Sequence, residues 1–251
     1  GGVSVGGGLG GKITLRECRF EENMGGAVWC GEYVAVEIDN SEFKSNGNYD
    51  KVPGVNYYED YDAYLQLVLD PFQPTIPMES FGEAGAITIS KHAPSAIVKK
   101  SRFFGNFTLG RGGAIRSDSD LTLDDCTFGN NESSRGGAVD LYYEPNQTGP
   151  RQTLVMNITD CTFSGNSAYL TGGGLFVRNG QITANDSSFI DNTARSGGGF
   201  YLTEGQMKVD RSFFMHNVAT GIERGHQTVT GEGQGGAVAC MNAKAQIWDS
   251  R

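Results

Sequence analysis

The chain has 251 residues, carries 29 acidic against 20 basic side chains for a net charge of −9, and includes 37 glycines. This negative charge repels a phosphate backbone, so we expect no nucleic-acid partner. Seven prolines are too few for a collagen-like chain, and no apolar run approaches the ~20 residues that span a bilayer. Apolar residues instead alternate with polar ones, which indicates half-buried strands.

Two short motifs alternate along the chain. The first is Cys or Ser, any residue, and then Phe-x-x-Asn, as at 18–23; the second is Gly-Gly-Ala before an apolar residue, as at 25–28. Uninterrupted copies are spaced 23, 25, 26 and 25 residues apart, and no helical or leucine-rich signature accompanies them, which favours a β-solenoid. The phenylalanines of the first motif are Phe20, Phe43, Phe103, Phe128, Phe163, Phe189 and Phe214.

Each repeat is interpreted as three short strands. Alternating apolar positions follow Gly-Gly-Ala, as in Val139 and Leu141; a second apolar pair comes next, as in Leu121 and Leu123; the Cys/Ser-x-Phe strand follows three residues later. Alternation of this kind buries one face of a strand. The sequence therefore predicts an all-β fold, a right-handed parallel β-helix of about eight coils.

Stacked coils place equivalent residues ~4.8 Å apart. The motif phenylalanines are then expected to form a continuous core stack. The motif asparagines are expected at a turn, where their amides can form a hydrogen-bonded ladder as in cross-β structures. The predicted ladder consists of Asn23, Asn46, Asn106, Asn131, Asn166, Asn192 and Asn217.

The alternation of Phe-x-x-Asn with Gly-Gly-Ala-Ile/Val, as at 103–106 and 112–115, resembles the repeats of the chlamydial polymorphic outer membrane proteins. It is also similar to other β-helical surface proteins of the pectate-lyase-like superfamily. The motifs run from Gly6 to the end of the chain. The resemblance implies an adhesive domain outside the cell or on its surface, with a host-cell or glycan ligand.

We expect one β-helix segment over 1–251, because neither end shows the polar cap that closes a solenoid. It would be internal to a longer chain or a fibre subunit, associating end to end or with flanking repeats. Insertions are expected at about 47–82, 142–152 and 218–234. Tyrosine is enriched at interfaces, so the first insertion is the candidate contact loop, the alternative being a flap packed on its own helix. Its tyrosines include Tyr57, Tyr58, Tyr61 and Tyr64.

Catalytic and metal chemistry finds little support in the sequence. Arg116, Asp140 and Arg178 occupy outward positions after Gly-Gly-Ala, but a chance trio is expected where 20% of residues are charged. Ca²⁺ at Glu59, Asp60 and Asp62 would lack the Asp-x-Asp-x-Asp-Gly loop. We therefore expect no catalytic residue, cofactor or metal. The expected function is a structural or adhesive scaffold; a polysaccharide lyase or glycoside hydrolase and a carbohydrate-binding adhesin are the alternatives.

The cysteines divide by their position in the repeat. Cys18, Cys126 and Cys161 lie two residues before the motif Phe, and the last two are expected on adjacent coils, close enough for a disulfide. Because Ser replaces Cys in other copies, buried free thiols acting as small hydrophobic groups are the favoured alternative. Cys30 and Cys240 lie near opposite ends and are not expected to pair.

Five Asn-x-Ser/Thr sequons are typical of a secreted glycoprotein, although an Asn-, Ser- and Thr-rich chain also forms sequons by chance. Asn106 and Asn131 belong to the predicted ladder, where a glycan would disrupt stacking. The expected glycosylation sites are the other three, Asn146, Asn157 and Asn185.

Overall fold

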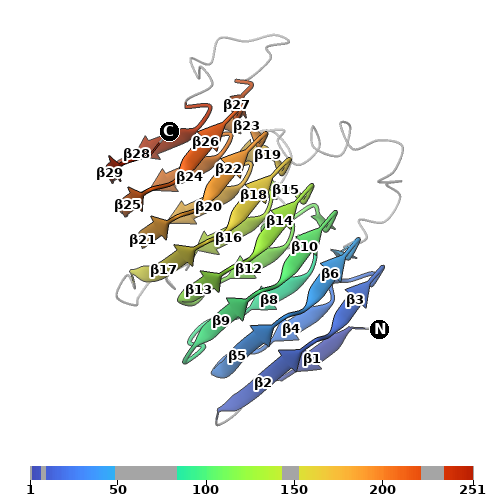
Figure 1. The fold of residues 1–251 in the computed structure, drawn as a ribbon. Helices are drawn as coiled ribbons and strands as arrows, with labels where there is room; N and C mark the ends of the chain where they lie inside the picture. The colour runs from blue at the N-terminus through green and yellow to red at the C-terminus, as the bar shows by residue number, and fades with distance from the viewer. Residues whose placement is uncertain (1, 7–9, 49–83, 143–152, 222–234, 251) are drawn as a thin grey trace, which may run out of the picture.

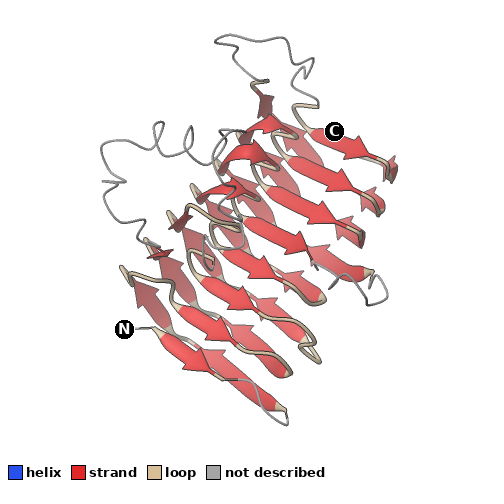
Figure 2. Ribbon diagram, turned by 180° about the vertical axis from the view of Figure 1, so that it is seen from behind, coloured by secondary structure: helices blue, strands red, loops and turns tan. Residues whose placement is uncertain are grey.

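The computed structural model describes residues 2–6, 10–48, 84–142, 153–221 and 235–250. In these ranges the chain consists of short strands and turns and contains no helix (Figure 2). The strands form four parallel sheets, which we call A to D, and the chain visits them in the order A, B, C, D in each coil. The coils rise from the N-terminal to the C-terminal end of the molecule (Figure 1).

Sheets A and B each contain eight strands, in agreement with the prediction of about eight coils. Sheet A follows the Gly-Gly-Ala motif and contains β1 (Val3–Val5), β4 (Val28–Cys30), β8 (Ile87–Ile89), β12 (Ile115–Ser117), β16 (Val139–Tyr142), β20 (Leu175–Arg178), β24 (Phe200–Thr203) and β28 (Val238–Met241). Sheet B contains β2 (Gly11–Arg16), β5 (Val34–Asp39), β9 (Ala96–Lys99), β13 (Leu121–Asp124), β17 (Leu154–Thr159), β21 (Gly180–Asn185), β25 (Gln206–Asp210) and β29 (Lys244–Trp248).

Sheet C carries the Phe motif, and sheet D is a fourth strand per coil where three were predicted. Residues such as 132–135, Glu-Ser-Ser-Arg, form a strand although no apolar alternation marks them, because their backbone pairs with the next coil. Sheet C contains β3 (Arg19–Glu21), β6 (Glu42–Lys44), β10 (Arg102–Phe104), β14 (Thr127–Gly129), β18 (Thr162–Ser164), β22 (Ser188–Ile190) and β26 (Phe213–Met215). Sheet D contains β7 (Gly47–Asn48), β11 (Phe107–Thr108), β15 (Glu132–Arg135), β19 (Ser167–Thr171), β23 (Thr193–Ser196) and β27 (Val218–Ala219).

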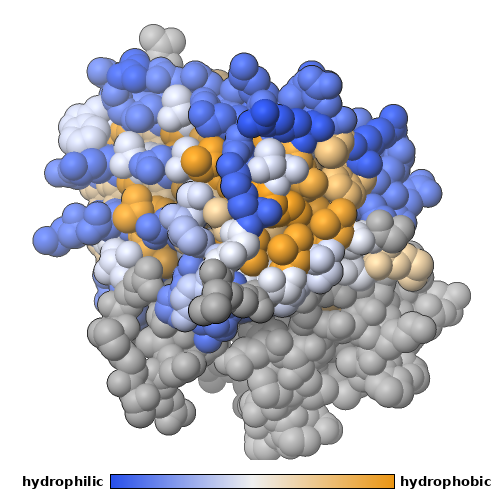
Figure 3. Space-filling view, turned by 90° about the horizontal axis from the view of Figure 1, so that it is seen from below, coloured by the Kyte–Doolittle hydropathy of each residue, from blue (hydrophilic) through white to orange (hydrophobic). Residues whose placement is uncertain are grey.

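A single apolar core runs the length of the solenoid. The seven motif phenylalanines stack with ring centroids 4.7–5.0 Å apart and planes within 8° of parallel. Phe128 and Phe163 are in direct register at 4.7 Å, although 35 residues separate them. Seen from below, the apolar centre is bordered by hydrophilic residues along the top of the view and at its sides (Figure 3).

The asparagine ladder is confirmed. The Asn106 amide Nδ2 donates to Oδ1 of Asn131 at 2.9 Å, and the Asn106 backbone N–H donates to the same oxygen at 3.0 Å. The same pair of bonds joins each of the seven asparagines to the next, from Asn23 to Asn217. The five inner members are buried, so each rung satisfies groups that water cannot reach.

A second polar ladder lies two residues before the Phe stack, where the thiols had been interpreted as small hydrophobic groups. The Ser187 hydroxyl accepts a hydrogen bond from the Cys161 N–H at 3.1 Å and donates to the Asn185 carbonyl at 2.7 Å. The Cys161 thiol likewise donates to the Thr159 carbonyl at 3.1 Å. Cys and Ser can replace each other here because both donate to the carbonyl two residues earlier.

Left-handed backbone closes the corners. The residue before each ladder asparagine has a positive φ, as at Asn130 (52°) and Asp191 (54°), and Gly fills this position in two coils. The Gly-Gly pair is needed at another corner. Gly112 has φ 69°, and a Cβ on Gly113 would lie 2.1 Å from the Gly137 carbonyl oxygen.

The Tyr-rich candidate contact loop and Asn146 lie outside the described residues. At the predicted starts of the insertions, Gly47–Asn48, Tyr142 and Val218–Ala219 are strand residues. The undescribed stretches 49–83 and 222–234 lead into β8 and β28, and 143–152 follows β16. All three therefore adjoin sheet A in the sequence, the first two through residues 84–86 and 235–237. Within the described ranges, no helix of a kind that could cross a membrane is found.

Candidate functional site

The outward face of sheet A is unusual because most of its middle row is buried. This row alternates with core positions such as Val139 and Leu141 and therefore points away from the core. Phe176, Tyr201 and Ala239 in this row form an apolar cluster separate from the main core. The register-aligned row is Ser4, Trp29, Thr88, Arg116, Asp140, Phe176, Tyr201 and Ala239. Ser4 is exposed, Trp29 and Arg116 are half-buried, and the other five are buried.

The predicted outward trio does not form a unit. Arg116 and Asp140 are register neighbours, but Arg178 aligns with Tyr142. Arg116 pairs with Asp118 at 3.0 Å, and Arg178 pairs with Glu204 at 3.5 Å. Each of these two arginines thus pairs with a carboxylate other than Asp140.

Asp140 is instead held by two arginines from the preceding corner. Nε of Arg135 donates to Oδ2 at 2.9 Å, and Nη1 of Arg111 lies 4.0 Å from Oδ1. Asp140 is fully buried, and Oδ1 has no hydrogen-bond partner among the described residues. Burial lowers the pKa of Arg111, and the Asp140 carboxylate opposes that shift.

Arginines and aromatic rings pack together beside Asp140, and we call Arg111, Arg135, Arg178, Tyr142 and Phe176 the arginine–aromatic cluster. The guanidinium groups of Arg111, Arg135 and Arg178 each lie 5.2 Å from the ring centroid of Tyr142. Arg135 also lies 4.4 Å from the ring centroid of Phe176, within cation–π range. The sequence contained a signal that was missed: Arg111 and Arg135 both stand directly before Gly-Gly-Ala, and the structure pairs them on adjacent coils.

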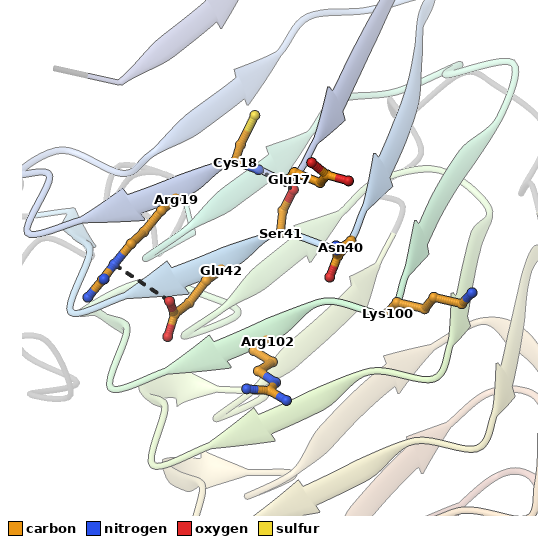
Figure 4. A pocket seen from close by; sticks show the side chains of 8 residues that line it. All are labelled: Glu17, Cys18, Arg19, Asn40, Ser41, Glu42, Lys100 and Arg102. Carbon is orange, nitrogen blue, oxygen red and sulfur yellow. Dashed lines mark hydrogen bonds and ion pairs between the residues drawn. The ribbon is translucent and has the colours of Figure 1, made fainter.

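A second candidate lies at the corner between sheets B and C in the first three coils (Figure 4). This corner pocket has a volume of about 470 Å³. Glu17, Asn40 and Lys100 occupy equivalent corner positions, each with a positive φ, between a strand of sheet B and one of sheet C. The pocket is lined by Glu17, Cys18, Arg19, Asn40, Ser41, Glu42, Lys100 and Arg102.

Charge in the corner pocket is only partly compensated. Arg19 pairs with Glu21 at 2.8 Å and lies 3.5 Å from Glu42. In Figure 4 a dashed line joins Arg19 to Glu42, and none reaches Lys100 or Arg102. Among the described residues, neither of these two cations forms an ion pair. Residue types vary from coil to coil at this corner, and aligning Glu17, Asn40 and Lys100 by coil would have brought them together.

A smaller pocket of about 250 Å³ lies at the corner between sheets A and B in the later coils. It is lined mainly by amides, a carboxylate and glycine backbone, and Gln181 and Gln206 are register neighbours within it. Its lining residues are Thr153, Asn179, Gly180, Gln181, Glu204, Gly205, Gln206, Asn242 and Lys244.

The cysteines and sequons occupy different environments. All five cysteines lie in the described ranges and are unpaired. The hydrogen bond to the Cys126 thiol, together with burial, raises the pKa of Cys161, while burial raises the pKa of Cys30 to about 12. Asn157 is exposed between buried Met156 and Ile158, and Asn185 is the half-buried last residue of β21.

Comparison with protein families matches residues 1–231 to the model described as the right-handed β-helix region. The chain belongs to the right-handed β-helix family. Comparison with curated proteins and with solved structures gives no match. The β-helix family includes both enzymes and proteins without catalytic activity. Membership therefore establishes the architecture, and the function has to be argued from the sites described above.

Proposed function

We propose that this β-helix is an extracellular or cell-surface scaffold with an adhesive role and no catalytic activity. The observation that carries the proposal is the unbroken Phe stack flanked by two hydrogen-bonded ladders through successive coils. Such a frame is stiff, and its corners admit long insertions without interrupting the core. The resemblance to polymorphic outer membrane proteins supports the adhesive role.

Adhesion is tested by coating beads with the purified chain and counting beads retained on cultured host cells. We expect retention above that of beads coated with an unrelated β-solenoid of similar charge. Equal retention by the two proteins would remove the adhesive role.

Secretion is supported by the exposed position of Asn157 at the centre of an outward strand face. Expression through a eukaryotic secretory pathway followed by glycopeptide mapping tests the assignment. We expect glycans on Asn157, Asn185 and Asn146, and none on Asn106 or Asn131, whose amides are buried in the ladder. A glycan on either ladder residue in folded protein would contradict the fold-based assignment.

Self-association along the axis is part of the proposal. All five residues of β29 are exposed, and Ile247 and Trp248 are each 48% exposed. An open strand edge of this kind accepts another strand in register, from further coils of the same chain or from a second copy. Electron microscopy of the purified protein distinguishes the two: filaments indicate a second copy, whereas single short rods remove fibre assembly from the proposal.

A polysaccharide-active enzyme is the second candidate, favoured by one observation. Asp140 presents a buried carboxylate oxygen without a hydrogen-bond partner among the described residues, beside arginines and aromatic rings. Turnover of acidic or neutral polysaccharides that is lost in Asp140→Asn would establish the enzyme. We expect no turnover by the wild-type chain.

A further inference from the structure

The corner pocket offers side chains, and no backbone, to a ligand. The N–H of Glu17 donates to the Asp39 carbonyl at 3.1 Å, and that of Asn40 donates to the Lys99 carbonyl at 3.1 Å. The Lys100 N–H donates to the Asp124 carbonyl at 2.9 Å. Because each corner amide already pairs with the next coil, a peptide cannot bind here by strand addition. Recognition would depend on side-chain charge and hydrogen bonding.

The free side chains are arranged with a polarity along the solenoid axis. Lys100 and Arg102 lie on the third coil, Asn40 on the second and Glu17 on the first. All four side chains are exposed, and within the described residues none forms a side-chain hydrogen bond or ion pair. Two coil steps separate the cationic end from the carboxylate by ~10 Å. A ligand that fits has an anionic group at one end and hydrogen-bond donors at the other.

Charge balance favours an acidic ligand even though the chain as a whole is acidic. The pocket contains the cations Arg19, Lys100 and Arg102 against the carboxylates Glu17 and Glu42. Since Arg19 and Glu42 compensate each other, the third coil carries the excess positive charge. A volume of about 470 Å³ exceeds what a single small anion fills and lies in the range of small-ligand sites.

We propose that the corner pocket binds an acidic saccharide. Its carboxylate or sulfate accepts hydrogen bonds from Lys100 and Arg102, the Asn40 amide binds a hydroxyl of the adjoining ring, and Glu17 accepts a hydroxyl hydrogen. This assignment rests on the proposed adhesive function, for which it supplies the class of ligand.

Isothermal titration calorimetry of the full chain tests the site. Three tetrasaccharide probes are used: one containing uronic acid, its carboxyl-reduced neutral form, and that neutral form carrying sulfate. We expect binding of one or both acidic probes, weakening as salt is raised, and no binding of the neutral probe. The preferred acidic probe identifies carboxylate or sulfate as the recognised group. Absence of binding to both acidic probes at low salt overturns the proposal.

Two charge-matched double variants locate the binding. Lys100→Gln with Arg102→Gln removes the cationic end and is expected to weaken binding at least about tenfold, since each charge-assisted hydrogen bond is worth that order. Lys208→Gln with Arg211→Gln removes the same charge from exposed positions far along the axis, outside both pockets, and is expected to retain wild-type affinity. Unchanged binding by the first variant, or equal loss in both, overturns the site.

Glu17→Ala distinguishes a saccharide from a simple anion. It is expected to weaken binding of the acidic tetrasaccharide a few-fold while leaving inorganic sulfate unaffected. Competition by sulfate as strong as by the saccharide, with no effect of Glu17→Ala, overturns the saccharide assignment.

Adhesion itself has a separate readout. If coated beads adhere to cells while the pocket variants bind the saccharide normally, only the pocket assignment fails. If wild-type beads do not adhere, the adhesive function fails whatever the saccharide measurements give.

Discussion

The outward faces of sheets A and B have the same alternating pattern but opposite surroundings. On sheet B, outward residues such as Thr14, Asn157 and Lys208 are exposed. On sheet A, the outward Asp140 and Phe176 are buried, at 0% and 4% exposure. Alternation therefore reveals which side chains face the core but not whether the remaining ones meet water.

The difference has energetic consequences. Burial of an aromatic side chain such as Phe176 stabilises the fold by roughly 1.5–3 kcal/mol, whereas burial of the Asp140–Arg135 pair carries a desolvation cost that its contacts have to offset. Substitutions on the outward face of sheet A should therefore lower the free energy of unfolding strongly. Equivalent substitutions on sheet B should lower it only weakly.

The largest expected loss of folding stability is that of Asp140→Ala. Removing the carboxylate leaves Arg135 and Arg111 close together without compensation, and breaking a buried pair costs about 3–5 kcal/mol. Urea unfolding followed by circular dichroism measures the loss. The matched control is Asp186→Ala, which breaks the exposed pair with Arg211 near sheet B and should be hard to distinguish from wild type. Similar losses in the two variants would contradict the contrast between the faces.

Phe176→Ala should have the next largest effect. The ring stacks on Tyr201 at 5.7 Å between centroids and receives the Arg135 guanidinium, so truncation should cost about 3 kcal/mol. Val155→Ala removes an apolar side chain that is 37% exposed on the outward face of sheet B and should cost less than about 0.5 kcal/mol. Comparable unfolding midpoints for both variants would show that sheet A's outward row is not a second core.

The sequence was sufficient to predict the packing of the interior, because the interior residues repeat from coil to coil. Phe128 recurs as Phe163 and Asn131 as Asn166. Two identical motif residues in successive repeats are therefore neighbours on adjacent coils. The fourth strand was missed because Glu132–Arg135 has no apolar period, and its pairing depends only on the backbone.

The candidate sites were harder to predict, since their partners differ from coil to coil. Asp140 contacts arginines that stand before two different Gly-Gly pairs, and the corner pocket joins Glu17 to Lys100 across 83 positions of sequence. Such combinations become visible only once the register of every coil is known.

The smallest expected effect concerns charge on the exposed face of sheet B. Hydrogen bonds from Lys12 and Arg16 lower the pKa of Glu37 to about 2. The folded-state pKa of Glu37 lies below the unfolded value of about 4.3. The ionised Glu37 therefore stabilises the fold above about pH 4.3, and this stabilisation is lost as the pH falls towards 2. Glu37→Gln should therefore unfold slightly more easily than wild type at pH 7, and the two should converge near pH 2. The Glu37 side chain is 31% exposed, so added salt should also reduce the difference. Carboxyl chemical shifts measured through an acid titration give the pKa directly. A pKa near 4.3 for Glu37 would mean that its ion pairs with Lys12 and Arg16 do not form in solution. The outward face of sheet B would then be a purely solvated surface.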